Sequence, residues 1–339
     1  MAVGGKNVKR KKRINPEMFS YDMVLSAAEQ IKGIAVRTPL IENPILNKLV
    51  GGRVFLKCEN LQHTGSFKFR GAYNRLSRLS EEEKKAGVLA FSSGNHAQGI
   101  ARAAQMLGIK ATIIMPQDAP TLKVEGTRSY GADVVFYDRY NEDREEVAAR
   151  VAGNSGAVVV PPYNNEYIMA GQGTVGLEIA EDLKTLGVVP DQALVNCGGA
   201  GLCSGAFTAL YSAFPDLQGY AVEPQEFDDV NRSLVSGDIE MVDFGARSIC
   251  DALLTPSAGS LTFPVLKDLG IKGLTISDDE ARKAVGYAAR TLKIVGEPGG
   301  VASLAAVLAG KLNLKGKTTV CVISGGNIDP AMLIECMQH

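Results

Sequence analysis

Short apolar runs alternate with amphipathic segments along the chain from about residue 20 onward. Runs rich in β-branched residues at 111–115, 132–137 and 157–160 predict buried strands. The segments 98–107 and 142–151 mix apolar and polar residues at helical spacing and predict helices between those strands. Strands that alternate with helices are typical of parallel sheets with helices on both faces. The pattern therefore predicts an α/β fold.

The alternation continues on both sides of a break rich in proline and asparagine. Further apolar runs predict strands at 88–91, 193–197, 220–222 and 318–323. Ser277 and Glu280 form a capping box that predicts a helix running toward Leu292. Another helix is expected to start near Ala206. The break itself, at 161–165, predicts a crossing between two domains.

Composition restricts the class of protein. With 339 residues, the chain is long enough for one large or two medium domains with buried cores. We expect no membrane partner, because no apolar run is as long as a membrane span and the N-terminus has no signal-peptide pattern. The six cysteines are scattered without a CxxC pair, which predicts reduced thiols in a cytoplasmic protein.

The N-terminal residues differ in charge from the rest. Six of the first thirteen residues are Lys or Arg, while the whole chain has a net charge of −1. A short basic run of this kind predicts a disordered tail, here over residues 1–15. The body that follows is acidic and has no nucleic-acid motif, so we expect no nucleic-acid partner.

Lys68 stands between two aromatic residues, Phe67 and Phe69, directly after the turn at 64–66. An apolar setting lowers the pKa of a lysine, and a neutral amine can condense with an aldehyde. A lysine that begins an amphipathic helix and extends its ammonium group to water fits the same pattern equally well. From this segment alone, both interpretations stay open.

Three glycine-rich turns follow predicted strands, at 92–99, 197–205 and 324–327. Backbone N–H groups at such junctions suit a phosphate or a carboxylate. Gly199, Gly201 and Glu223 also imitate a dinucleotide-binding fingerprint, which keeps a nicotinamide-dependent dehydrogenase as a distant alternative. A reactive lysine, two anion-binding turns and the Ser324 hydroxyl at a strand end are together the parts that a pyridoxal-phosphate enzyme requires.

The chain resembles the serine/threonine dehydratase and serine racemase family, whose motifs it carries in the same order. The matching segments are 66–72, 92–99, 198–202 and 324–327. The family consists of pyridoxal-phosphate enzymes of fold type II, similar to tryptophan synthase β, and the likeness runs from about residue 20 to 335. It implies two domains, each with a mostly parallel sheet flanked by helices. The large cofactor-binding domain would comprise 16–84 and 161–339, and a small mobile domain would comprise 85–160.

The resemblance also implies how pyridoxal 5'-phosphate is held. Lys68 would form the Schiff base, with Phe67 packed beside the ring. Asn95 would hydrogen-bond the ring oxygen, and Ser324 would face the pyridine nitrogen. The remaining cofactor contacts would be the carboxylate of Glu297 and, for the phosphate, the backbone of Gly198, Gly199, Ala200, Gly201 and Leu202. The substrate carboxylate would be bound by Ser92, Ser93, Asn95 and His96.

By the same likeness, three residues match a divalent-cation site. Glu223, Asp229 and the Phe227 carbonyl would offer hard oxygen ligands, which suit Mg²⁺ or Ca²⁺. The alternative is that Asp229 only begins a helix. The resemblance further implies a homodimer.

The predicted reaction is β-elimination from a hydroxy amino acid such as L-threonine, L-serine or 3-hydroxyaspartate, which gives a 2-oxo acid and ammonia. A hydroxyl at Ser324, in place of a carboxylate, would leave the pyridine nitrogen unprotonated and favour prompt loss of the β-hydroxyl. Lys68 would remove the α-proton. Ser93 occupies the family position of a second acid or base, so serine racemase stays an alternative. Arg144 is a candidate for an acidic group of the substrate, although a solvent-exposed helix arginine fits as well.

Ala200 departs from the family pattern, which usually has glycine at this position of the phosphate turn. A methyl group fits there if φ is negative. If φ is positive, we expect phosphate affinity to suffer.

Overall fold

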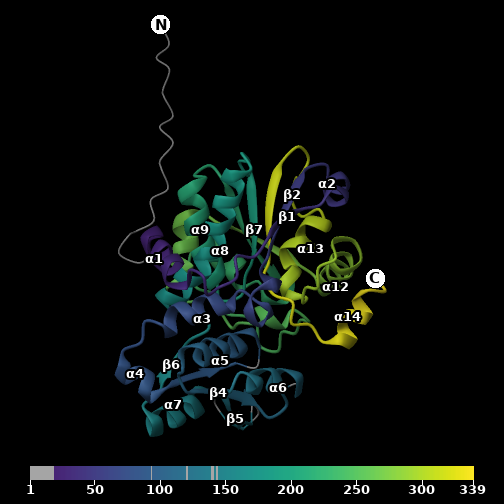
Figure 1. The fold of residues 1–339 in the computed structure, drawn as a ribbon. Helices are drawn as coiled ribbons and strands as arrows, with labels where there is room; N and C mark the ends of the chain where they lie inside the picture. Colours follow the sequence, from purple (N-terminus) through teal and green to yellow (C-terminus); the bar gives the residue numbers. More distant parts are fainter. Residues whose placement is uncertain (1–18, 93, 120, 139–140, 143) are drawn as a thin grey trace.

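The structure is a computed structural model that describes residues 19–92, 94–119, 121–138, 141–142 and 144–339. The predicted tail over 1–15 and the candidate Ser93 lie outside the described residues. Two sheets form the framework (Figure 1). In spatial order, the larger sheet comprises β1 (Leu40–Glu42), β2 (Arg53–Cys58), β10 (Thr318–Ile323), β7 (Gln192–Asn196), β8 (Gln218–Pro224) and β9 (Lys272–Ile276). The smaller sheet comprises β5 (Asp133–Tyr137), β4 (Ala111–Pro116), β3 (Val88–Phe91) and β6 (Val158–Val159).

Helices connect these strands and cover the sheets. The helices up to residue 155 are α1 (Tyr21–Ile31), α2 (Pro44–Val50), α3 (Lys68–Leu76), α4 (Glu81–Ala86), α5 (Asn95–Leu107), α6 (Thr121–Ser129) and α7 (Arg144–Ser155). The later helices are α8 (Glu166–Thr185), α9 (Gly201–Ala213), α10 (Asp229–Ser236), α11 (Thr262–Leu269), α12 (Asp278–Tyr287), α13 (Ala302–Leu308) and α14 (Pro330–Cys336). All strand pairs are parallel except β1 with β2. The predicted α/β fold is confirmed.

The larger sheet is buried on both faces, as central parallel strands require. Successive residues of a strand point to opposite faces. On β7, Val195 packs in the cluster that contains Phe207 of α9, whereas Leu194 packs in the cluster that contains Leu304 of α13. Figure 1 shows α8 and α9 on one side of β7, and α12 and α13 on the other.

Helix α3 joins the two sheets. Its buried residues Phe69, Ala72 and Leu76 share a hydrophobic cluster with Val88 and Ala90 of β3. All four strands of the smaller sheet lie within 88–159, inside the predicted small domain. The division at 85–160 and the mobility of that domain stay predictions.

Several helix limits differ from the expectation. Helix α5 begins at Asn95 and not at 98, and α7 covers Arg144–Ser155 and not 142–151. Helix α9 begins at Gly201 and not near Ala206, because Gly205 belongs to the helix itself. A Cβ on Gly205 would lie 2.2 Å from the carbonyl oxygen of Met169, so this glycine allows close packing of α9 on α8. Helix α12 has the predicted capping box but ends at Tyr287, where a π-helical turn over Ala288–Leu292 takes over.

Candidate active site

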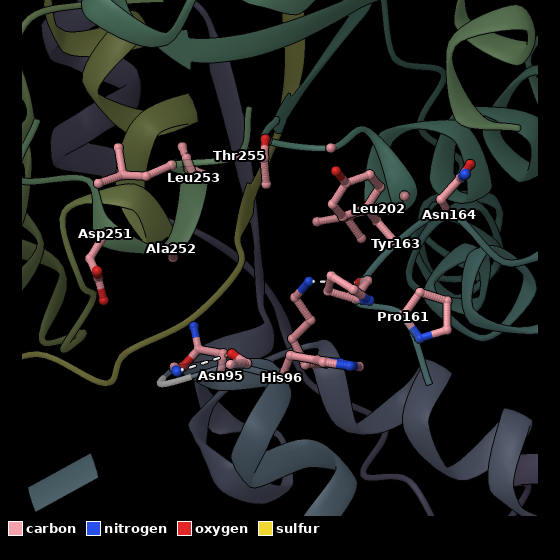
Figure 2. A pocket seen from close by; sticks show the side chains of 18 of the residues that line it. Asn95, His96, Pro161, Tyr163, Asn164, Leu202, Asp251, Ala252, Leu253 and Thr255 are labelled. Atoms are coloured by element: carbon pink, nitrogen blue, oxygen red, sulfur yellow. Dashed lines mark hydrogen bonds between the residues drawn. The ribbon is translucent and has the colours of Figure 1, made fainter. Parts of the chain in front are cut away.

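A cavity of about 640 Å³ is lined by residues of both sheets and their loops. Its walls include Asn196 and Ser324 at the carboxyl ends of β7 and β10, and Ser92 after β3. Ligands of open α/β sheets bind at these strand ends. Twelve predicted site residues line it: Phe67, Lys68, Ser92, Asn95, His96, Gly198, Gly199, Ala200, Gly201, Leu202, Glu297 and Ser324. Figure 2 shows Asn95 and His96 on one side of the cavity, and Leu253 and Thr255 on the opposite side.

The other candidates do not line this cavity. Ser93 is outside the described residues, and of Arg144 only the position at the start of α7 is described. Glu223, Phe227 and Asp229 lie elsewhere, around the end of β8 and the start of α10.

Lys68 begins α3, and its side chain reaches the cavity. The Nζ atom donates a hydrogen bond to the carbonyl oxygen of Pro162 at 3.0 Å and lies 5.2 Å from the centroid of the Phe67 ring. Burial lowers the pKa of Lys68 to about 8, although the charge of Glu297 acts in the opposite direction. The lysine therefore begins a helix, as one interpretation expected, and its side chain lines the cavity. Its reaction with an aldehyde stays a prediction.

The turn between β7 and α9 forms one wall of the cavity. Ala200 has φ +65° and caps α9, so the unpaired N–H groups of the first helical turn border the cavity. A Cβ on Gly199 would lie 2.4 Å from the Tyr163 ring, which explains why this position needs glycine. A side chain of α11 also holds the turn in place, because the Thr262 hydroxyl donates to the carbonyl oxygen of Gly199 at 2.8 Å.

Thr255 was not identified from the sequence. Its Oγ1 is buried without a hydrogen-bond partner among the described residues, and a Cβ on Gly198 would lie 3.2 Å from it. An unpaired hydroxyl beside the N-terminus of a helix fits a bound phosphate. No motif around Thr255 indicates this role, since the residue is far in sequence from the turn that it faces.

Ser324 is held as a hydrogen-bond donor. The Asn196 Nδ2 atom donates to Ser324 Oγ at 2.9 Å, while Asn196 Oδ1 accepts from the backbone N–H and the hydroxyl of Ser303 at 2.7 and 2.5 Å. The Ser303 contacts fix which end of the Asn196 amide faces Ser324. Because Ser324 Oγ accepts one bond, its own proton is available for a basic ring nitrogen in the cavity. Asn196 is a second residue that the sequence did not single out.

Asn95 is engaged at both ends of its amide. Its Nδ2 donates to Glu297 Oε1 at 2.7 Å, and its Oδ1 accepts from Asn327 Nδ2 at 2.7 Å. Burial raises the pKa of Glu297 to about 7, against the lowering effect of the bond from Asn95. The role of Asn95 at a cofactor ring oxygen stays a prediction. To bind that oxygen, Asn95 would have to give up its hydrogen bond to Glu297 or to Asn327.

His96 is buried, and its Nε2 atom lies 3.0 Å from the carbonyl oxygen of Val160. Burial and the nearby charge of Lys68 lower the pKa of His96 to about 3. The imidazole is therefore neutral, and this suits a hydrogen-bonding role more than proton transfer.

Glu223 and Asp229 approach each other away from the cavity. Glu223 accepts hydrogen bonds from the backbone N–H groups of Val230 and Asn231 at 3.0 and 2.7 Å. Burial, followed by the charge of Asp229, raises the pKa of Glu223. Asp229 does begin α10, yet its Oδ2 atom is buried without a hydrogen-bond partner among the described residues. Among the residues that the structure describes, no group of three or more His, Cys, Asp or Glu side chains could hold a metal ion.

Comparison with known proteins gives consistent matches. The family model described as "Pyridoxal-phosphate dependent enzyme" matches residues 31–325. An L-threo-3-hydroxyaspartate ammonia-lyase from Pseudomonas sp is 44% identical over 92% of this chain and 97% of that protein. A serine racemase from Schizosaccharomyces pombe is 44% identical over 91% of this chain and 94% of that protein. Among solved structures, a threonine deaminase from T.th. has a TM-score of 0.86 and 40% identity, covering 91% of this chain and 99% of that one.

Proposed function

The chain belongs to the family of pyridoxal-phosphate dependent enzymes, and we propose that it is an ammonia-lyase acting on a hydroxy amino acid. The substrate would be L-threonine, L-serine or a 3-hydroxyaspartate, and the products a 2-oxo acid and ammonia. The observation that carries the proposal is the donor hydroxyl of Ser324, fixed by Asn196 in the same cavity as Lys68. Two relatives support it, since one is named for hydroxyaspartate and one for threonine.

Different residues of the cavity would bind different parts of the cofactor. Lys68 would hold the cofactor, and the N–H groups of the turn before α9, with the Thr255 hydroxyl, would hold its phosphate. When bound, pyridoxal phosphate stabilises negative charge at the α-carbon of an amino acid. Ser324 would donate to the ring nitrogen and leave it without a full positive charge. Weaker charge stabilisation of this kind favours early departure of a β-hydroxyl.

Proton transfer would be carried out by Lys68. A pKa of about 8 leaves part of its amine unprotonated near neutral pH, so that Nζ can accept the α-proton. His96 and Asn95 would help to orient the substrate carboxylate by hydrogen bonds, together with Ser92. The cavity is lined by residues from both sheet regions, and closure of these regions over the substrate would exclude water during the reaction.

The proposed function is tested by 2-oxo acid release from the protein supplied with pyridoxal phosphate and Mg²⁺. Substrates would be L- and D-serine, L-threonine and the 3-hydroxyaspartate isomers. Release from at least one is expected. Absence of release from all of them would contradict the proposal.

Serine racemase is the second candidate. It is supported by the 44% identity to the Schizosaccharomyces pombe enzyme and by a serine at position 93. Racemisation needs an acid or base on each face of the substrate, and Ser93 would act opposite Lys68. Chiral analysis of L-serine incubations separates this activity from elimination.

Replacing Ala200 with glycine is expected to tighten pyridoxal-phosphate binding by up to about tenfold. An L-residue in the left-handed region costs about 1–2 kcal/mol, and φ at Ala200 is +65°. The strain opposes the turn geometry that presents N–H groups to a phosphate. Cofactor titration followed by absorbance measures the effect, and Ala213→Gly at the far end of α9 is the control. Equal affinity in Ala200→Gly and the parent would contradict the expectation.

We also propose a divalent cation, Mg²⁺ or Ca²⁺, held by Glu223, Asp229 and the Phe227 carbonyl. The support is chemical: two buried carboxylates lie together, and Asp229 Oδ2 lacks a partner among the described residues. Such oxygen ligands suit a hard cation.

Removal of the cation with a chelator should lower the thermal midpoint of the parent protein, because a ligand that binds only the folded state stabilises it. Glu223→Gln should abolish this cation dependence. The control is Glu226→Gln, which alters an exposed carboxylate in the same segment. An equal cation-dependent rise in Glu223→Gln would refute the assignment.

A homodimer and a cytoplasmic location also remain proposals. The dimer rests on resemblance and is tested by sedimentation. The location is supported by six cysteines that are all buried and free. No helix in the described part of the chain has both the length and the apolar character that a bilayer crossing needs.

A further inference from the structure

An ion pair at the cavity joins the two parts of the protein, the one built on the smaller sheet and the one built on the larger sheet. Lys123 lies on α6, next to the smaller sheet, and Asp251 lies in the short 3₁₀ turn Asp251–Leu253, between α10 and α11. Lys123 Nζ pairs with Asp251 Oδ2, and both residues line the cavity. Figure 2 shows the Asp251 carboxylate directed toward the side on which Asn95 lies.

The charge of Lys123 acts on the interior of the cavity. It lowers the pKa of the buried Glu297 carboxyl, whereas the charge of Asp251 raises it. Glu297 in turn bonds Asn95, one of the proposed substrate contacts. The ammonium group of Lys123 therefore lies within electrostatic reach of the place where substrate is expected.

The cavity contains few positive charges. Among its described lining residues, the side chains that can carry a positive charge are Lys68, Lys123 and His96. His96 is neutral, because burial lowers its pKa to about 3. Lys68 is committed to the cofactor and the α-proton. Lys123 is thus the described cation that remains for a second negative group on a substrate.

The present partner of Lys123 is suited to exchange. The side chain of Asp251 is 60% exposed and that of Lys123 is 24% exposed. An ion pair of this exposure contributes little, about 1 kcal/mol or less. A carboxylate that arrives from inside the cavity can replace Asp251 at small cost and gains strength where water is excluded.

We propose that Lys123 binds the side-chain carboxylate of a hydroxy dicarboxylic amino acid of the 3-hydroxyaspartate type and so selects this substrate over serine or threonine. Asp251 holds the ammonium group at the cavity when no such carboxylate is bound. This inference rests on the proposed ammonia-lyase function and names the substrate class of the same site.

The test compares the Michaelis constants for L-threonine and for the 3-hydroxyaspartate isomers, measured with the holoenzyme and its variants. Lys123→Met should raise the constant for hydroxyaspartate relative to that for threonine by about tenfold or more, the effect of losing a charge-assisted hydrogen bond. Lys123→Arg keeps the charge and should retain most of the preference. The matched control is Lys110→Met, which removes a lysine of the same part whose ion pair with Asp133 is largely exposed and outside the cavity lining.

A binding measurement gives a second readout that needs no turnover. Calorimetry should show that the parent holoenzyme binds succinate more tightly than butyrate, a monocarboxylate of equal chain length. Lys123→Met should remove this preference, whereas Lys110→Met should preserve it.

The outcomes separate the two proposals. If the ratio of Michaelis constants and the succinate preference are unchanged in Lys123→Met, or if both constants rise in parallel, Lys123 only joins the two parts and the inference is overturned. A parent that releases 2-oxo acid from L-threonine but neither uses 3-hydroxyaspartate nor prefers succinate overturns it as well. A parent without turnover of any substrate contradicts the ammonia-lyase function instead.

Discussion

Replacing Lys68 with alanine should reduce 2-oxo acid release by about 10⁴-fold, because we propose that this one side chain both holds the cofactor and transfers the α-proton. Positioned proton transfer alone contributes about 10²- to 10⁴-fold. The Lys68 amine lies in the cavity beside the Pro162 carbonyl, and burial lowers its pKa to about 8. The loss should persist at saturating pyridoxal phosphate, since added cofactor cannot replace the base.

Two measurements separate the roles of this lysine. Borohydride treatment should attach the cofactor to the Lys68 peptide of the parent and leave that peptide unmodified in Lys68→Ala. Lys68→Arg tests whether positive charge alone is sufficient, because an arginine cannot lose its proton in a protein. We expect Lys68→Arg to be as inactive as Lys68→Ala. Turnover together with a borohydride-reducible chromophore in Lys68→Ala would falsify the assignment.

Local signals in the sequence were sufficient for the fold class and the family. Apolar runs such as 111–115 and 318–323 predict strands because β4 and β10 are buried. The family predicted from four motifs is confirmed by the match over 31–325. That match leaves the nicotinamide-dependent alternative without support. The start of α9 was predicted too late, because the packing of Gly205 against α8 is a tertiary contact that a glycine-rich segment does not reveal.

The sequence did not reveal contacts between distant segments. Thr255 faces Gly198 across a long separation in the chain, and Asn196 fixes Ser324 through a bond between residues 128 positions apart. The pair of Lys123 and Asp251 has the same separation of 128 positions. No motif in the sequence singles out Lys123. These residues come together only because the two sheet regions meet at one cavity.

A cluster of buried charges around Arg70 of α3 was also not predicted from the sequence. Arg70, two residues after Lys68, has a fully buried side chain. Its guanidinium donates to both oxygens of Glu59 at 2.8 Å and to the two oxygens of Glu178 at 2.7 and 2.9 Å. Glu178 also accepts from Lys57 at 2.6 Å. Burial alone would raise the pKa of Glu178, but Arg70 and Lys57 lower it below its usual value.

Arg70→Ala is therefore expected to destabilise the protein by about 3–5 kcal/mol, because it leaves buried carboxylates without their main partner. The thermal midpoint measured by circular dichroism should fall by several degrees. The matched control is Arg37→Ala, whose guanidinium pairs with Glu181 and Asp182 at the surface and is 52% exposed. Exposed pairs of this kind contribute about 1 kcal/mol or less.

Arg70→Lys makes the expectation more specific. Lysine keeps a positive charge but lacks the planar fork that binds two carboxylates at once, so an intermediate loss of stability is expected. Since α3 begins at Lys68, displacement of the helix should also weaken cofactor attachment in the order Arg70→Ala, Arg70→Lys, parent. A fall in the midpoint of Arg70→Ala no larger than that of Arg37→Ala would show that the buried cluster does not hold this helix in place.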